Sequence, residues 1–283
     1  MGGKSHSADW IISHFPRHDC YVEPFGGAAW ILLAKTPSAI EVLNDINGDL
    51  MNFWTVLRDH TSELVAKVAF TPYSRALYEN LREKWRSGQR PESKLERAYE
   101  WYVLIRQSFS GILFTGWSHG KGKSWVSPAK KWVNAANRLV EVADRLSTVQ
   151  LECRDYREVI EIYDSAETLF YIDPPYISCP AGYYDGHVLD EQAHRDLSLL
   201  LNNVKGKVVV SYYPNPLVDE LYPQHKWRRD EKQVMKHSMG ITRNHSAIHR
   251  PRATELLLMN YEPTATSLPQ ARLPELIEAT ANV

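Results

Sequence analysis

The chain has 283 residues, of which 43% are hydrophobic and 24% charged, and its formal net charge is −1. This composition excludes disorder as the main state, and the length allows one large domain or one domain with a substantial insertion. No apolar run reaches the roughly 20 residues that span a bilayer, and the first residues lack the apolar stretch of a signal peptide. Three widely spaced cysteines, Cys20, Cys153 and Cys179, favour a reducing cytoplasm without a disulfide framework.

The first part of the chain alternates strand and helix. Residues 21–23 predict a short strand, 28–34 an apolar helix and 40–43 a second strand. Asn47 is placed to cap the next helix, whose expected buried stripe is Leu50, Phe53, Trp54 and Leu57. This order of elements is typical of the βαβ unit that begins a nucleotide-binding domain.

Residues 61–147 have a different character, with many Tyr, Trp, Arg and Glu residues at helical spacing. Two apolar stripes predict helices, the first with Leu95, Ala98, Tyr99, Tyr102 and Ile105, the second with Val133, Ala136, Val140 and Ala143. A Gly-rich basic stretch separates them, which predicts a loop or hairpin over 111–127. We therefore expect a mostly helical insertion over 61–147.

Strand and helix alternation then resumes. Strands are predicted at 149–152, 169–172 and 208–211, with a helix near 190–203. Residues 234–239 and 255–261 are expected to form a closing antiparallel pair. The remaining residues, 262–283, show little periodicity and predict a loose tail.

The strand at 169–172 ends in the tetrapeptide Asp173-Pro174-Pro175-Tyr176. Two prolines cannot donate backbone hydrogen bonds, so the sheet must end there in a rigid turn. The turn carries one carboxylate, one fixed carbonyl on Pro174 and one aromatic face. These groups suit an exocyclic amino group on a planar base, which offers two hydrogens to accept and a ring to stack on. The alternative is a strand-terminating turn with a surface Asp.

Gly26 and Gly27 permit a tight turn with close backbone approach to a ligand, and Asp45 follows 18 residues after Gly27, at the end of the next strand. This is the usual relation of a glycine turn to a ribose-binding acid. The alternative for Asp45 is a helix cap. The full G-x-G-x-x-G pattern is missing, which argues against a pyrophosphate cradle and a nicotinamide-dependent oxidoreductase.

Two stretches of the chain are locally basic. Residues 224–252 contain eight Lys or Arg against two acids, and residues 112–132 contain four Lys and no acid. The histidines His237, His245 and His249 are interpreted as basic-loop residues rather than metal ligands. Such stretches in a neutral chain suit a phosphate-facing cleft, although solvated loops are the alternative.

The order Gly2-Gly3-Lys4, Glu23-Pro24-Phe25-Gly26-Gly27, Asn44-Asp45 and Asp173-Pro174-Pro175-Tyr176 resembles the Dam-type DNA adenine methyltransferases over most of residues 2–261. The resemblance implies a Rossmann-like α/β fold with a mixed, mostly parallel sheet and a helical target-recognition insertion. It also implies methyl transfer from S-adenosylmethionine, leaving S-adenosylhomocysteine, to the N6 amino group of a flipped adenine. We expect double-stranded DNA as the partner, no metal, no membrane, a monomer and a cytoplasmic location in a bacterium or an infected host.

The resemblance and the motifs together give an expected role to each candidate residue. The expected catalytic residues are Asp173, Pro174, Pro175 and Tyr176. The expected cofactor-binding residues are Lys4, at the methionine end, with Glu23, Phe25, Gly26, Gly27, Asp45, Asp155, Tyr156 and Asp173. The expected DNA-binding residues are Arg106, Ser110, Trp117, His119, Lys121, Lys123, Lys130, Lys131 and Arg243. The catalytic domain is expected to comprise 1–60 and 148–261.

Two alternatives stay open on the sequence alone. The same chemistry could act on adenine in RNA or on the amino group of cytosine, although the motif order and the basic insertion favour adenine in DNA. A non-catalytic DNA-binding protein could also retain this fold, which the intact Asp-Pro-Pro-Tyr motif disfavours.

Overall fold

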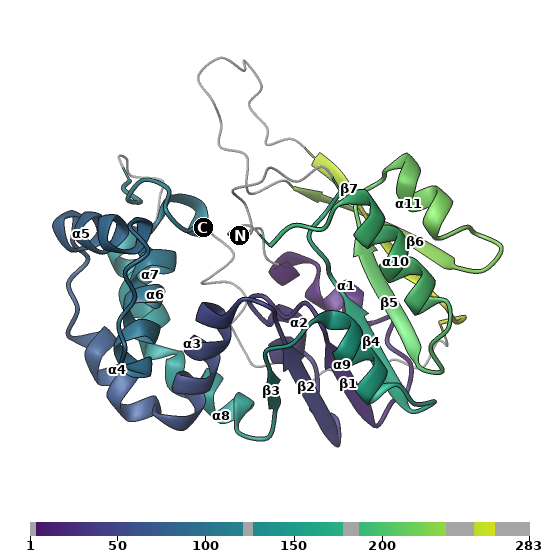
Figure 1. Ribbon diagram of the computed structural model, residues 1–283, viewed down its shortest axis with the longest axis horizontal. Coiled ribbons are helices and arrows are strands. Elements are labelled where there is room, and N and C mark those ends of the chain that lie inside the picture. The colour runs from purple at the N-terminus through teal and green to yellow at the C-terminus, as the bar shows by residue number, and fades with distance from the viewer. Residues whose placement is uncertain (1–3, 121–126, 178–186, 236–251, 264–283) are drawn as a thin grey trace, which may run out of the picture. The chain divides into compact units, whose positions relative to one another are not determined.

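The computed structural model describes residues 4–120, 127–177, 187–235 and 252–263, which form two compact units (Figure 1). We call residues 47–151 the helical unit, and the described residues within 2–46 and 152–273 the sheet unit. Helix α3 (Gly48–Asp59) packs against α6 (Lys94–Gln107), so it belongs with the helical unit. The units therefore divide near residues 46 and 151, whereas the sequence placed the boundaries at 60 and 148.

The seven-stranded sheet confirms the predicted mixed α/β fold. Its order is β3-β2-β1-β4-β5-β7-β6, in which β1 pairs in parallel with β2 and β4, and β4 with β5. Strand β7 runs antiparallel to both β5 and β6, so the last described strands form an antiparallel pair as expected. The expected partner was wrong, because residues 255–259 pair with 228–232 and not with 234–239, of which 236–239 lie outside the described residues. The strands are β1 (Cys20–Glu23), β2 (Ile40–Asn44), β3 (Gln150–Glu152), β4 (Thr168–Ile172), β5 (Lys207–Tyr212), β6 (Arg228–Met235) and β7 (Arg252–Met259).

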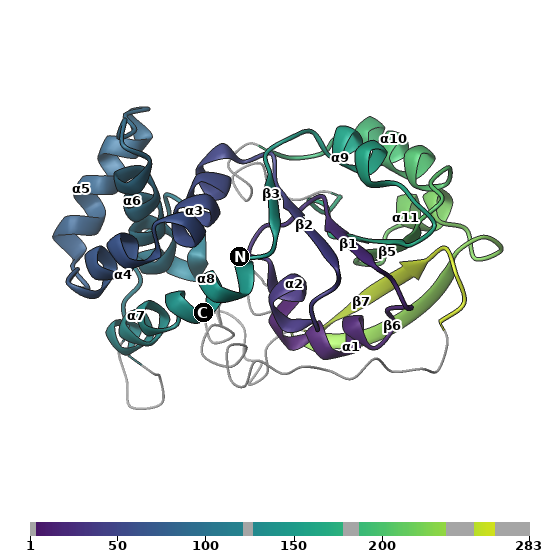
Figure 2. The same ribbon diagram turned by 90° about the horizontal axis from the view of Figure 1, so that it is seen from below.

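Helices cover both faces of the sheet (Figure 2). One face carries α9 (Tyr156–Tyr163), α10 (Glu191–Leu201) and α11 (Pro216–Leu221), and the other carries η1 (Lys4–His6), α1 (Ala8–Ile12) and α2 (Trp30–Ala34). Because strand side chains alternate, Phe170, Val210 and Leu256 join the apolar core beneath α9 and α10. Their neighbours Tyr171, Ser211 and Glu255 therefore face the N-terminal helices, where Phe15 packs on Tyr171.

The helical unit is built around aromatic side chains. Its remaining helices are α4 (Thr61–Ala69), α5 (Arg75–Arg86), η2 (Phe109–Gly111), α7 (Pro128–Asn137) and α8 (Leu139–Leu146). Phe53 of α3 stacks on Tyr102 of α6, with ring centroids 5.2 Å apart. The Trp132 indole N–H donates to the Thr71 carbonyl at 3.0 Å, which ties α7 to the end of α4. A mostly helical segment over these residues is what the sequence predicted.

The predicted apolar stripes were right for α3 and partly wrong for α7 and α8. All four expected α3 residues are buried, but Val133 and Val140 are 54% and 47% exposed. Trp132 and Val142 are buried in their place. The buried stripe keeps one helical period through Arg138, and Val133 and Val140 each lie one residue past a buried position of it, Trp132 and Leu139.

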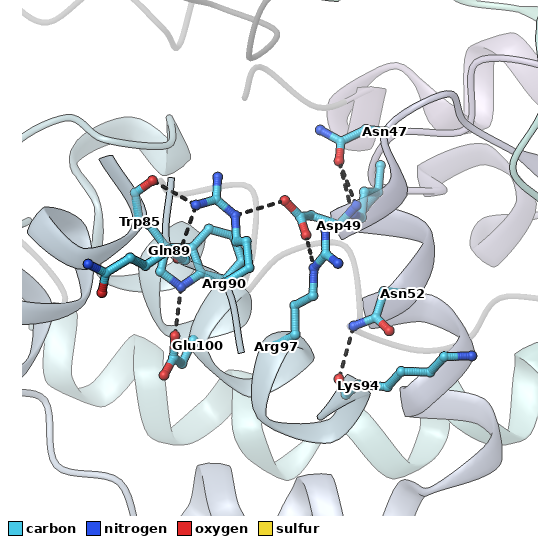
Figure 3. A network of polar contacts seen from close by, with 10 residues as sticks. Asn47, Asp49, Asn52, Trp85, Gln89, Arg90, Lys94, Arg97 and Glu100 are labelled. Carbon is cyan, nitrogen blue, oxygen red and sulfur yellow. Dashed lines mark hydrogen bonds and ion pairs between the residues drawn. The ribbon is translucent and has the colours of Figure 1, made fainter. Parts of the chain in front are cut away.

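An ion network joins three helices of this unit (Figure 3). Asp49, in the first turn of α3, pairs with Arg97 of α6 and lies 3.4 Å from the Nε of Arg90. The Arg90 guanidinium covers the Trp85 ring of α5 at 4.1 Å, and the Trp85 indole N–H donates to Glu100 at 2.7 Å. Asp49 therefore anchors the start of α3 to α5 and α6.

Replacing Asp49 by Asn should lower the free energy of unfolding by about 1.5–3 kcal/mol, because charged hydrogen bonds to two arginines are lost. Urea unfolding of the purified protein measures this. The matched control is Asp59→Asn at the other end of α3, where the carboxylate pairs with Arg58 in solvent and should contribute less than about 1 kcal/mol. Equal losses in the two variants would contradict an anchoring role for Asp49.

Over the described ranges, no helix combines the length and the apolar character that crossing a membrane requires. The same residues contain no group of three or more His, Cys, Asp or Glu side chains arranged to hold a metal ion.

Candidate active site

The candidate active site lies at the carboxyl ends of the parallel strands. From β1 the chain passes to its neighbour β2, whereas β4 lies on the opposite side of β1, so the strand order reverses between β1 and β4. Ligands of open α/β sheets bind at such a point. The segment Pro24–Gly27 follows β1, Asp45 follows β2 and Asp173–Tyr176 follows β4. The fold thus brings three of the predicted motifs to one edge.

The glycine turn is held against the end of β2. The Gly26 N–H donates to the Asn44 carbonyl at 2.6 Å, and a Cβ at Gly26 would lie 2.9 Å from that oxygen, so only glycine fits. The Gly27 N–H donates to Asp45 Oδ2 at 2.9 Å. Asn47, as predicted, caps α3 by accepting from the Asp49 and Leu50 N–H groups. The structure therefore links Asp45 to the glycine turn, and the helix cap is Asn47.

An aromatic pair lies beside this turn. The Phe25 and Tyr156 rings are 5.0 Å apart and inclined by 33°. Asp155 is the N-cap of α9, where its side chain accepts from the Arg157 N–H at 2.9 Å. The cap fixes the start of α9 at Tyr156, and the expected cofactor contacts of Asp155 and Tyr156 stay a prediction.

Glu23 is buried and has internal partners. Its Oε1 accepts from the Tyr21 hydroxyl and from the Leu32 N–H of α2, both at 2.7 Å. Burial raises the pKa of Glu23 to about 8, against the opposing effect of these hydrogen bonds. Its carboxyl group therefore ties β1 to α2.

The two oxygens of Asp173 have different surroundings. Oδ1 accepts from the Ser211 hydroxyl at 3.0 Å and the Tyr176 hydroxyl at 3.1 Å, and lies 3.3 Å from the Lys4 ammonium. Oδ2 has no hydrogen-bond partner among the residues that the structure describes, and the side chain is 28% exposed. One oxygen is thus anchored while the other stays open to a ligand.

Lys4 is enclosed by oxygen atoms of the site. Besides Asp173, its ammonium contacts the Tyr176 hydroxyl and Oε1 of Glu255 on β7. Burial alone would lower the pKa of Lys4, but the charges of Asp173 and Glu255 outweigh burial and hold it above its usual value. Burial raises the pKa of Asp173, and the Lys4 charge opposes that rise. Lys4 is therefore cationic and favours the ionised form of Asp173.

Two residues of this cluster, Ser211 and Glu255, were missed by the sequence analysis. Ser211 ends the predicted strand 208–211, and Glu255 begins the predicted strand 255–261. Each was counted only as a strand residue. The available signal was polarity at a strand position whose flanking residues are apolar, as with Ser211 after Val208–Val210.

The Tyr176 ring faces a second aromatic residue. It lies 4.8 Å from the Tyr213 ring at a steep angle and 6.0 Å from the Tyr212 ring. Both tyrosines come from the carboxyl end of β5. The hydroxyl of Tyr176 contacts Oδ1 of Asp173 and the Lys4 ammonium, which restrains the orientation of its ring.

Several predicted DNA-binding residues gather in one loop of the helical unit. Ser108 and Trp117 form an antiparallel bridge, and Ser110 between them has a left-handed φ of 59°. The Trp117 ring packs on Tyr73, and His119 stacks on Trp117. Arg106 lies at the end of α6, while Lys130 and Lys131 lie in the first turn of α7; the other three, Lys121, Lys123 and Arg243, lie outside the described residues.

Part of the basic stretch at residues 224–252 forms the edge strand β6. Arg229 pairs with Asp219 at 2.6 Å and Arg228 with Glu262 at 3.6 Å, acids that lie outside residues 224–252. The positive charge counted along this stretch is therefore partly balanced by contacts that the sequence did not reveal.

Comparison with known proteins agrees with this arrangement. The family model of the D12 class of N6 adenine-specific DNA methyltransferases matches residues 1–235. A DNA adenine methylase of Escherichia coli K12 is 28% identical over 277 residues, covering 94% of this chain and 95% of that protein. The Type II methyltransferase M1.LlaDCHI of Lactococcus lactis subsp. cremoris is 25% identical over 281 residues, covering 92% and 93%. The chain therefore belongs to the D12 class of N6 adenine-specific DNA methyltransferases.

Proposed function

We propose that this DNA adenine methyltransferase moves the methyl group of S-adenosylmethionine to an adenine that has been turned out of double-stranded DNA. The open Oδ2 of Asp173, beside an Oδ1 anchored by three groups, carries the proposal. A paired adenine is inaccessible within the duplex, so the base must leave it first. We expect the enzyme to act as a monomer in the cytoplasm and to need no metal.

The residues around the glycine turn fit an adenosyl group. Gly26 leaves no room for a side chain, as a close backbone approach requires. Asp45 would bind the ribose hydroxyls, and Phe25 with Tyr156 would contact the adenine ring of the donor. When bound, S-adenosylmethionine supplies a methyl group activated by a positively charged sulfur.

The adenine amino nitrogen is a poor nucleophile, because its lone pair is delocalised into the ring. If Asp173 Oδ2 and the Pro174 carbonyl each accept one amino hydrogen, the nitrogen is biased towards a tetrahedral shape with its lone pair directed outward. Orientation of this kind contributes roughly 7–11 kcal/mol. The Asp173 carboxylate also stabilises the positive charge that develops on the nitrogen.

Tyr176 is expected to stack on the flipped base. Replacing it by Ala should weaken binding of duplex DNA that contains the target by about 1–3 kcal/mol, seen as a raised KM for DNA. Replacing it by Phe keeps the ring but removes the hydroxyl that anchors Asp173 and Lys4, so kcat should fall with little change in KM. If both variants changed KM and kcat alike, the two functions assigned to ring and hydroxyl would be wrong.

We infer that the helical unit recognises the target sequence and holds the DNA backbone. The logarithm of the DNA-binding constant falls linearly with the logarithm of the salt concentration, and each phosphate contact contributes about 0.9 to the steepness of that line. Removing the charges of Lys121 and Lys123 together should therefore make the line less steep by up to about 1.8. Titrations at several salt concentrations measure this. Lys205→Gln with Lys207→Gln, exposed at the amino end of β5, is the matched control and should leave the slope unchanged. An unchanged slope in the first variant would contradict the inferred contacts.

One experiment tests the acceptor directly. The protein is incubated with tritiated S-adenosylmethionine and either duplex DNA or RNA, and the labelled nucleoside is identified after digestion. N6-methyladenine in DNA supports the proposal. Label found only in RNA, or only in cytosine, would show that the acceptor is not adenine in DNA. If no substrate were labelled, the protein would be a non-catalytic DNA-binding protein with a methyltransferase fold. Mapping modified bases in DNA from expressing cells then gives the recognition sequence.

A further inference from the structure

Glu255 is a buried carboxylate with both oxygens engaged. Its side chain is 4% exposed on β7, where it faces the N-terminal helices. Oε1 contacts the Lys4 ammonium, and Oε2 accepts from the Ser7 hydroxyl at 2.8 Å. Both partners belong to the N-terminal segment, which we define as residues 4–14. Glu255 is therefore too deeply buried to reach a substrate, and we expect its effect to pass through that segment.

Other contacts hold the far end of the N-terminal segment against strand β6 and against Tyr261, which follows β7. The His14 ring lies 2.7 Å from Asp230, and the Trp10 indole N–H donates to the same carboxylate at 3.2 Å. The Tyr261 hydroxyl donates to the His14 carbonyl at 2.9 Å. These contacts lie several residues beyond Lys4. Besides Asp173 and Tyr176, only Glu255 among the described residues binds the Lys4 ammonium.

We propose that Glu255 is a positioning residue that holds the ammonium of Lys4 against Oδ1 of Asp173 during methyl transfer. This inference rests on the function proposed above. Lys4 has a long flexible side chain, so one partner alone orders it poorly. Glu255 supplies the second partner from a central part of the sheet, with Ser7 fixing its orientation. Lys4 then stays on Oδ1, which leaves Oδ2 for the amino group.

The charges around Asp173 make the proposal testable by the direction of a pH shift. The titratable groups that face Asp173 are Lys4, Glu255, Glu23, Tyr171, Tyr176 and Tyr212. Burial raises the pKa of Asp173, the Lys4 charge lowers it, and the Glu255 charge raises it. If Glu255 acted only through its own charge, its removal would lower the pKa of Asp173. If it positions Lys4, its removal releases Lys4 and raises that pKa.

The first experiment is the pH dependence of kcat for Glu255→Gln at saturating S-adenosylmethionine and duplex DNA. We expect the acid limb to move to higher pH by about one unit, because loss of a nearby opposite charge raises a carboxyl pKa by about one unit or more. The control is Glu41→Gln, which removes the partner of another buried lysine, Lys35, in the same unit. Its acid limb should match wild type. A limb that stays in place or moves to lower pH in Glu255→Gln would overturn the proposal.

A second experiment does not depend on catalysis. Acetic anhydride labels exposed lysines, and mass spectrometry gives the rate at each one. Lys4 should be protected in wild type and should react more than about tenfold faster in Glu255→Gln, because a broken buried ion pair is costly to keep in place. In Glu41→Gln the increase should appear at Lys35 instead. Unchanged protection of Lys4 would refute positioning by Glu255, even if wild type transferred no methyl group and the proposed function had failed.

Two further variants distinguish a positioning role of Glu255 from a general loss of folding. Glu255→Asp keeps the charge and should restore part of the wild-type acid limb. Lys4→Met combined with Glu255→Gln should give an acid limb no higher than that of Lys4→Met alone, because Glu255 then has no Lys4 to hold and only its own charge, which raises the pKa of Asp173, is removed. Additive shifts in the double variant would show that the two residues act separately, against the proposal.

Discussion

Replacing Asp173 by Asn should lower kcat for methyl transfer by at least about a thousandfold, the upper range for loss of one group that stabilises transition-state charge. Asn keeps the shape of Asp but not its charge. Three groups that donate to Oδ1, on Lys4, Tyr176 and Ser211, select the amide oxygen for that position. The amide NH₂ is thereby placed at the former Oδ2, where it would meet the amino group of adenine, a second donor.

Single-turnover methylation of a duplex that contains the target measures this effect without product release. The matched control is Asp164→Asn, which alters contacts with the Lys205 and Gly206 N–H groups at the amino end of β5 and should retain activity. Activity of Asp173→Asn within tenfold of wild type would mean that the open oxygen is not the amino acceptor.

Replacing Lys4 by Met should lower the free energy of unfolding by about 3–5 kcal/mol, because two largely buried carboxylates lose their cation. The pKa of Lys4 is raised in the folded protein, so its contribution is complete below pH 10.5 and is lost as the pH rises further. In the variant, the pKa of Asp173 rises above its wild-type value. The penalty should therefore shrink as the pH falls and Asp173 becomes protonated.

Urea unfolding at about pH 5 and pH 8 measures both the size and the pH dependence of this loss. Lys67→Met is the control, because Lys67 forms a partly exposed pair with Glu96 at 2.6 Å and should contribute less than about 1 kcal/mol. A loss in Lys4→Met that is small, or that grows towards acid pH, would contradict the charge assignment of the cluster.

The features that the sequence predicted correctly depend on local pattern. Strands β1, β2, β4 and β5 are short apolar runs, and turn residues follow them directly. Parallel pairing then brings the ends of these strands to one edge, which is why Gly27 and Asp45 meet although 18 residues separate them. The Asp-Pro-Pro-Tyr motif could be assigned to the same edge of the sheet because it directly follows the apolar run of β4.

The features that were missed depend on contacts between distant segments. Nothing near Glu255 in the sequence indicates that Lys4, 251 residues away, neutralises it. Likewise, the acids that balance β6 come from outside the basic stretch. The error at Val133 and Val140 has a local cause, because the buried helical period passes through Trp132 and Leu139, one residue before each of these valines.

The opposite orientation of neighbouring residues on β7 couples correct strand pairing to chemistry. Glu255 faces Lys4, whereas Leu256 lies in the apolar core on the other side of the sheet. A slip of β7 by one position against β5 would exchange the two side chains, placing an aliphatic group beside the ammonium and a carboxylate in hydrocarbon. Molecules with this misregister would lose both the Lys4 ion pair and core packing. Methylation activity would therefore come only from molecules whose sheet is correctly paired.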